Sequence, residues 1–267
     1  MLMAAAIQMT STDDVAGNLV RAEKLICWAV RHGAKLISLP ENFAYMRSEN
    51  EEVIYHQRVG GELTDWLAEL ARRFEIYLLG GSFPEEQDAG KVYNTSLLID
   101  PIGKVCAHYR KIHLFDATLA DGTMLAESRY VAPGNELAIA DINSHKVGLT
   151  ICYDLRFPEL YRRLTLMGAE LIFVPSAFTV PTGRDHWEAL LRARAIENQV
   201  YIIAPAQFGQ HNPKRASYGR AMIIDPWGTV LAKAPDRECV VLAEIDFDHL
   251  ARVRSLMPCR QHIRLPI

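Results

Sequence analysis

A cysteine stands at the end of an apolar run in residues 148–159, which read GLTICYDLRFPE. The alternating pattern of residues 145–152 predicts a strand that ends at Cys152. Pro158 is typical of a first helical turn, so the cysteine would lie close to the N-terminal end of a helix. The helix dipole favours a thiolate at such a position, but a buried and unreactive core thiol fits the same strand.

Two charged residues follow other predicted elements. In residues 34–43, AKLISLPENF, a short apolar strand stops at Pro40, which cannot donate a hydrogen bond to a central sheet, and Glu41 follows it. Lys111, in the stretch CAHYRKIHLF, comes after a hairpin signalled by Asp-Pro and a glycine. Both charges are therefore expected at the ends of strands, where side chains can reach a pocket.

The elements that would position these residues occur twice along the chain. Residues 33–43, GAKLISLPENF, align with residues 168–178, GAELIFVPSAF, and the first of these follows a helix predicted over residues 18–32. Two further pairs align in the same order, namely 76–81 with 200–205 and 93–105 with 218–230. Each member of the last pair carries the Asp-Pro and glycine of a hairpin turn.

This order indicates an α/β fold built from two pseudo-symmetric halves, with the sheets packed together and helices outside, as a four-layer α-β-β-α sandwich. We expect one domain over residues 1–267, with a C-terminal tail from about residue 250. The halves are unequal, because Glu41 aligns with Ser176 and Lys111 has no basic counterpart. A single site assembled from both halves is the simplest interpretation.

Composition excludes several classes of function. Intermixed charges, 29 basic and 32 acidic, give a net charge of -3, which provides no basic surface for nucleic acid or an anionic membrane. No apolar run reaches 18 residues and the N-terminus lacks a basic leader region, so we expect a cytoplasmic protein with a small-molecule partner. The five cysteines have no metal-ligand spacing, and no GxSxG, phosphate-loop or GxGxxG motif is present.

Three segments resemble the signature segments of the nitrilase, or carbon–nitrogen hydrolase, superfamily: LPENF around Glu41, YRKIHLF around Lys111, and GLTICYDLRFPELYR around Cys152. The resemblance extends from the first strand to about Asp246, and it implies the same four-layer fold. It also implies that Cys152 is the nucleophile, Glu41 the general base and acid, and Lys111 the cation beside the oxyanion. The backbone N–H of Tyr153 would be the second oxyanion donor.

Glu127, in LAESRY, matches a further glutamate that many members of the superfamily place in the pocket, although a surface carboxylate would also suit this loop. The resemblance implies an amide-cleaving reaction through a thioester, without metal or organic cofactor. Residues 206–219, AQFGQHNPKRASYG, are similar to members of the Nit branch that act on deaminated glutathione. The alternatives are an ω-amidase, a nitrilase, an N-carbamoyl amide hydrolase and a catalytically idle scaffold.

An anionic substrate would require cations in the pocket. The candidates are Arg156, Arg184, Lys214 and Arg215, with His186 as a further pocket residue, although each could instead be a surface or structural residue. Asp185 is a departure from related sequences, which often have a small residue there, and it would oppose an anionic substrate if it faced the pocket. The family resemblance further implies a homodimer.

Overall fold

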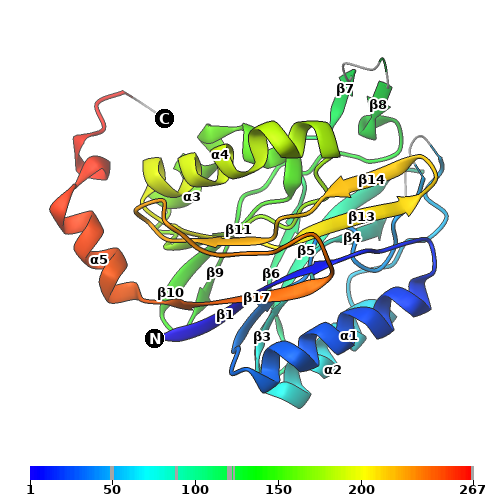
Figure 1. Ribbon diagram of the computed structural model, residues 1–267, viewed down its shortest axis with the longest axis horizontal. Coiled ribbons are helices and arrows are strands. Elements are labelled where there is room, and N and C mark those ends of the chain that lie inside the picture. Colours follow the sequence, from blue (N-terminus) through cyan, green and yellow to red (C-terminus); the bar gives the residue numbers. More distant parts are fainter. Residues whose placement is uncertain (49–50, 88–89, 119–121, 123, 266–267) are drawn as a thin grey trace.

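The duplicated sequence pattern corresponds to two large β-sheets (Figure 1). The computed structural model describes residues 1–48, 51–87, 90–118, 122 and 124–265. Within these residues the first sheet has nine strands in the order β14-β13-β1-β2-β3-β5-β4, with β17 beside β1 and β6 beside β5. The strands are β1 (Leu2–Met9), β2 (Leu36–Ser38), β3 (Tyr77–Leu79), β4 (Phe83–Glu86), β5 (Val92–Ile99), β6 (Val105–Arg110), β13 (Ala206–Asn212), β14 (Arg215–Tyr218) and β17 (Cys239–Ile245).

The second sheet has six strands among the same described residues, in the order β16-β15-β12-β11-β10-β9. They are β9 (Ala138–Ile142), β10 (His145–Leu149), β11 (Leu171–Phe173), β12 (Tyr201–Ala204), β15 (Met222–Ile224) and β16 (Val230–Lys233). A separate ribbon pairs β7 (Asp116–Thr118) with β8 (Met124–Ala126).

Helices α1 (Val15–Arg31) and α2 (Glu62–Phe74) lie on one side of the molecule, and α3 (Pro158–Leu166) and α4 (Val180–Asn198) on the other (Figure 1). Side chains of β1 alternate between two cores, because Ala4 and Ala6 pack with the second sheet while Ala5 and Ile7 pack with Ile26 of α1. One face of the sheet thus meets helices and the other meets the second sheet. The predicted four-layer sandwich is confirmed.

The two halves share the same strand connectivity. In the first, β1, β2 and β3 are parallel neighbours followed by antiparallel β5 and β6. In the second, β10, β11 and β12 are parallel neighbours followed by antiparallel β15 and β16. The hairpin turns also match: Asp100 Oδ1 accepts from the N–H of Ile102, and Asp225 Oδ1 accepts from that of Trp227.

The tail beyond the second sheet begins with α5 (Phe247–Leu256) and continues into the short 3-10 helix η3 (Cys259–His262). The Arg254 guanidinium donates to the carbonyl oxygens of Gln199 and Ala169, so α5 is held against the end of the second half. No helix in the described part of the chain is long and apolar enough to cross a membrane.

Candidate active site

Cys152 opens a 3-10 helix, η2 (Cys152–Arg156), instead of ending a strand. The preceding strand β10 stops at Leu149, three residues earlier than its side-chain alternation predicts, and α3 begins only at Pro158. Cys152 has a φ of 49°, a conformation that is uncommon for a residue with a side chain. Its N–H donates to the carbonyl oxygen of Pro175 at 3.0 Å, which fixes the turn against the end of β11.

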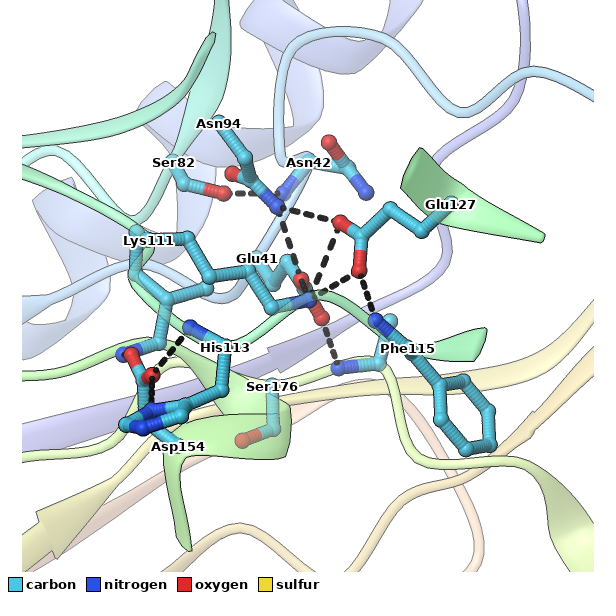
Figure 2. Close-up of polar contacts among 12 residues, drawn as sticks. Glu41, Asn42, Ser82, Asn94, Lys111, His113, Phe115, Glu127, Asp154 and Ser176 are labelled. Atoms are coloured by element: carbon cyan, nitrogen blue, oxygen red, sulfur yellow. Dashed lines mark hydrogen bonds and ion pairs between the residues drawn. The ribbon is translucent and has the colours of Figure 1, made fainter. Parts of the chain in front are cut away.

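The buried carboxylate of Asp154 ties this turn to the segment that carries the predicted lysine. Asp154 Oδ2 accepts from the N–H of Ile151 at 2.9 Å and from the Tyr109 hydroxyl at 2.7 Å. Its Oδ1 accepts from the N–H of His113 and lies 2.7 Å from Nδ1 of the same residue (Figure 2). Since Lys111 lies between Tyr109 and His113, one carboxylate aligns the lysine segment with Cys152.

Lys111, the residue directly after β6, lies between two carboxylates (Figure 2). Its Nζ is 3.1 Å from Oε1 of Glu41, and 3.0 and 2.8 Å from the two oxygens of Glu127. The side chain of Lys111 is only 2% exposed, that of Glu41 4% and that of Glu127 15%. Such a buried cation needs both counter-charges and hydrogen bonds, which the two carboxylates supply.

Further donors fix both carboxylates. Asn94, the third residue of β5, donates through Nδ2 to Glu41 Oε1 at 2.9 Å and approaches Glu127 Oε1 at 3.4 Å (Figure 2). The other oxygen of Glu41 accepts from the N–H of Ala177 at 2.8 Å, and Glu127 Oε2 accepts from the N–H of Phe115 at 2.6 Å. Each carboxylate is thus held by a main-chain donor and by the buried Asn94 and Lys111 side chains.

The charge balance keeps the thiol neutral at rest. Burial and the charge of Glu41 raise the pKa of Cys152 well above its ordinary value, against the lowering effect of Lys111. Burial alone would lower the pKa of Lys111, but the charges of Glu127 and Glu41 raise it well above its ordinary value. The thiolate expected from a nearby helix end and cation is therefore disfavoured, because burial and the charge of Glu41 outweigh them.

The side chains of Glu41, Asn94, Lys111, Glu127 and Cys152 line one pocket that is open to solvent. Of the predicted substrate-binding residues, Arg215 also lines it. Arg156 lines a smaller recess that adjoins Cys152, and its guanidinium lies 3.3 Å from Nδ1 of His186. Arg184 lines a separate surface groove. His186, Lys214 and Asp185 are exposed, and they line neither the main pocket, nor the recess beside Cys152, nor this groove.

Sequence reasoning missed Asn94 and Arg47, which both line the pocket. Asn94 lies in the apolar strand segment VYNTSLLI, where a polar side chain is the one signal that could have indicated it. Arg47 follows β2 by nine residues, at a spacing that matches no motif. Its main-chain oxygen accepts a hydrogen bond from Arg215 at 3.1 Å, so the loop that carries it and the β13–β14 hairpin meet at the pocket.

The described residues contain no group of three His, Cys, Asp or Glu side chains placed to hold a metal ion. The residues of the pocket offer instead a thiol, a carboxylate able to accept its proton, and a buried ammonium group. This set is chemically suited to nucleophilic attack on a carbonyl carbon with stabilisation of the resulting oxyanion.

Comparison with known proteins agrees with this chemistry. The family described as carbon-nitrogen hydrolase matches residues 3–255. A Synechocystis protein named deaminated glutathione amidase is 47% identical over 264 residues, which are 97% of either chain. The human protein of the same name is 41% identical over 268 residues, covering 98% of this chain and 82% of that one.

Among solved structures, the C. elegans NitFhit protein has a TM-score of 0.92 and 40% sequence identity. The match covers 98% of this chain and 65% of that one. The family predicted from the three signature segments is confirmed by its match to 253 of 267 residues, since it spans 3–255. The chain belongs to the carbon–nitrogen hydrolase family.

Proposed function

We propose that this enzyme hydrolyses the amide bond of deaminated glutathione and releases 2-oxoglutarate and cysteinylglycine. Two relatives that match nearly the whole chain carry the name of that activity. The observation that supports the chemistry best is the convergence of Glu41, Lys111 and Cys152 on one pocket, with Glu127 beside the lysine. The substrate is thus a small carboxylate amide.

The acylation step in this proposal begins with a neutral thiol. Glu41 accepts the proton of Cys152 as Sγ attacks the amide carbon, which is why a base is needed where burial raises the thiol pKa. The negative charge that develops on the carbonyl oxygen is stabilised by Lys111 Nζ and by the N–H of Tyr153, in the first turn of η2. Each such donor typically contributes about 3 kcal/mol.

Collapse of the tetrahedral intermediate breaks the carbon–nitrogen bond. Glu41 returns its proton to the departing amine, and a thioester to Cys152 remains. Glu41 then accepts a proton from a water molecule that attacks the thioester, and Cys152 leaves as the thiol. One carboxylate thus acts as base and acid in both steps, for which its fixed position next to Lys111 and the N–H of Ala177 is suited.

Glu127 has a positioning role in the proposed mechanism. Both of its oxygens contact Lys111 Nζ, so it sets the direction in which the ammonium group points. Arg215 is the proposed partner of a substrate carboxylate, because it lines the same pocket and is tethered to the main chain of Arg47. Arg156 belongs to the adjoining recess, and Arg184 and His186 are not assigned to the substrate by their positions.

Substrate comparison tests this function directly. Purified enzyme is supplied with deaminated glutathione, 2-oxoglutaramate and simple amides, while 2-oxoglutarate and ammonia are both measured. We expect the highest kcat/KM for deaminated glutathione. A strong preference for 2-oxoglutaramate would identify an ω-amidase instead, and normal activity of Cys152→Ala would refute the mechanism.

Thiol labelling separates an enzyme from an idle scaffold. All five cysteines are free of disulfides, and only Cys152 lines the pocket. Preincubation with substrate should protect Cys152 from alkylation, as shown by mass spectrometry, because the acyl group occupies its sulfur. Equal labelling with and without substrate would favour a scaffold.

The proposal includes assembly as a homodimer in the cytoplasm. Apolar side chains are exposed where α3 ends and on the tail, with Leu166 49%, Met167 43% and Leu256 83% exposed. The hydrogen bond from Arg254 to Ala169 brings these two segments together. Light scattering should give the mass of two chains for the wild type and of one for Leu256→Glu. The unpaired cysteines suit a reducing compartment.

A further inference from the structure

The main chain at the proposed base makes a tight turn inside the protein. Glu41 is followed by Asn42, whose φ of 55° places it in the left-handed region. The N–H of Asn42 donates to the Ser82 hydroxyl at 3.0 Å (Figure 2). The carbonyl oxygens of Glu41 and Phe43 each accept from a buried side chain. Backbone in this conformation persists where its surroundings hold it, so the direction of the Glu41 side chain depends on these hydrogen bonds.

Gln207 of β13 holds this turn, although it does not line the pocket. It is fully buried, and its Nε2 donates to the carbonyl oxygen of Glu41 at 3.0 Å and to the Ser11 hydroxyl at 2.8 Å. Its Oε1 accepts from the N–H of Ser11 at 3.0 Å. The Ser11 hydroxyl in turn donates to the carbonyl oxygen of Phe43 at 2.7 Å. One amide and one hydroxyl thus bind the carbonyl oxygens on both sides of Asn42.

The main chain of Gln207 is connected to the other end of Glu41. Its N–H donates to the carbonyl oxygen of Ser176 at 2.8 Å. That carbonyl belongs to the same planar peptide unit as the N–H of Ala177, which donates to Glu41 Oε2 at 2.8 Å. Gln207 therefore binds the carbonyl of Glu41 through its side chain and is linked to the carboxylate of Glu41 through one peptide unit.

A buried histidine extends the network on the far side of Ser11. His211 Nδ1 lies 2.8 Å from the carbonyl oxygen of Ser11, which can only accept, so Nδ1 carries the proton. Its Nε2 lies 2.8 Å from the Ser217 hydroxyl, which is then the donor. Burial lowers the pKa of His211 to about 4, so the ring is neutral near pH 7. Because Gln207, Ser11 and Ser217 do not titrate, the network keeps one arrangement around neutral pH.

Within the proposed function, in which Glu41 is the base, we propose that Gln207 is its positioning residue. Gln207 fixes the main chain that carries Glu41 and thereby keeps the carboxylate beside Lys111 and Cys152. It lines no part of the pocket, so it acts on the reaction through Glu41 alone. The two residues are 166 positions apart in the sequence, and their contact also fixes how the two halves meet at the site.

The neighbouring strand supplies a matched control. Gln8 of β1 is as fully buried as Gln207, and β1 pairs with β13 at this point. Its amide also makes three hydrogen bonds, in this case to main-chain groups of Pro235, Arg237 and Ala221. The variants Gln8→Met and Gln207→Met therefore remove equivalent sets of bonds from equal burial, but only the second removes a bond to Glu41.

The first test compares steady-state kinetics and urea unfolding of both variants, with the amide that wild type cleaves best. Methionine conserves volume and cannot donate, so both variants should lose similar unfolding free energy. We expect kcat to fall at least about tenfold in Gln207→Met with KM nearly constant, and to stay within about twofold of wild type in Gln8→Met. Similar kcat values for the two variants overturn the proposal.

Ser11→Ala keeps the test decisive if Gln207→Met does not fold. It removes the hydroxyl that binds the carbonyl oxygen of Phe43 and accepts from Gln207, with a smaller change of volume. We expect kcat to fall at least about threefold relative to Gln8→Met. A Ser11→Ala enzyme with the kcat of Gln8→Met contradicts the positioning role.

Alkylation of Cys152 by iodoacetamide needs no substrate and separates the positioning role from the proposed function. Burial and the charge of Glu41 raise the pKa of Cys152. A displaced carboxylate should therefore move the profile of alkylation rate against pH to lower pH in Gln207→Met, and Gln8→Met should keep the wild-type profile. If wild type cleaves none of the amides and the profile still moves, positioning stands and the proposed function fails. If wild type cleaves deaminated glutathione and the profile does not move, the function stands and positioning fails.

Discussion

Replacement of Asn94 by alanine tests a proposed positioning residue that contacts all three charged residues of the candidate active site. Its Nδ2 donates to Glu41 at 2.9 Å and approaches Glu127 at 3.4 Å, and its main-chain oxygen accepts from the N–H of Lys111. Alanine keeps the main-chain contact and removes only the amide. The direction of that amide is unambiguous, because both neighbouring groups are carboxylates and require a donor.

The expected loss follows from one strong hydrogen bond. A neutral donor on a carboxylate contributes about 1.5–3 kcal/mol, and the contact at 3.4 Å is too long to add much. A loss of about 2 kcal/mol in positioning Glu41 corresponds to roughly 30-fold in kcat. Stability should change little, because Asn94 Oδ1 is buried without a partner and its removal offsets the lost bond.

The assay is kcat and KM for the preferred amide, combined with urea unfolding of the same preparations. Ser96→Ala is the matched control: Ser96 is also buried on β5 and its Oγ is also unpartnered, but it does not line the pocket. We expect kcat to fall in Asn94→Ala alone, with KM nearly constant. A kcat above about a third of wild type, or equal losses in the two variants, would refute the positioning role.

Three further outcomes are expected. Burial and a nearby carboxylate raise the pKa of Cys152, so the rate of its alkylation, measured as a function of pH, should still increase above pH 9. A free thiol with a pKa of about 8.5 approaches its maximum rate there. A rate that reaches its plateau at lower pH would contradict this expectation. Glu127→Gln removes one counter-charge of the buried Lys111. In steady-state kinetics, kcat should fall at least about tenfold, and in urea unfolding the unfolding free energy should fall by about 3 kcal/mol. Burial alone would raise the pKa of Glu85, but hydrogen bonds, chiefly from Arg110, lower it from 4.5 to about 2. The resulting stability, about 3 kcal/mol, is present above pH 4.5 and lost as the pH falls towards 2, so acid titration should show this loss in wild type and not in Glu85→Gln.

The fold could be predicted from the sequence because duplication repeats the strongest local signals. Apolar strands stopped by Pro40 and Pro175, and Asp-Pro turns with a glycine, occur in the same order in both halves. Each signal depends on backbone chemistry within a few residues, which a sequence displays directly. Helix α1 begins at Val15, three residues before its predicted start, since the Asp14 carboxylate accepts from the N–H of Gly17 and caps it.

The supporting shell of the site could not be predicted in the same way. Asn94 reaches Glu41 across 53 residues of sequence, and the N–H of Ala177 reaches it across 136. Such contacts depend on how two sheets meet and leave no local spacing. The positive φ of Cys152 could not be predicted either. The turn is fixed by the Asp154 carboxylate, which accepts from the N–H of Ile151, and by the distant carbonyl oxygen of Pro175, which accepts from the N–H of Cys152.

The strand registers show how duplication yields one site instead of two. Leu36 of β2 pairs with Ala4, and the equivalent Leu171 of β11 pairs with Val147. Ala4 and Val147 are therefore equivalent positions. Five residues further along each half, the position of Cys152 is equivalent to that of Met9, whose thioether side chain is fully buried. The proposed nucleophile thus belongs to the second half alone.

The polar partners belong to the first half. In the alignment of residues 93–105 with 218–230, continued to the end of each hairpin, Asn94 is equivalent to Gly219 and Lys111 to Asp236. In the alignment of residues 33–43 with 168–178, Glu41 is equivalent to Ser176. The two equivalent strand ends meet, because the N–H of the residue after Ser176 donates to the Glu41 carboxylate. A reverse site would need a thiol, a base and a cation at positions occupied by Met9, a serine and an aspartate, so the symmetric scaffold brings one complete set of groups to a single centre.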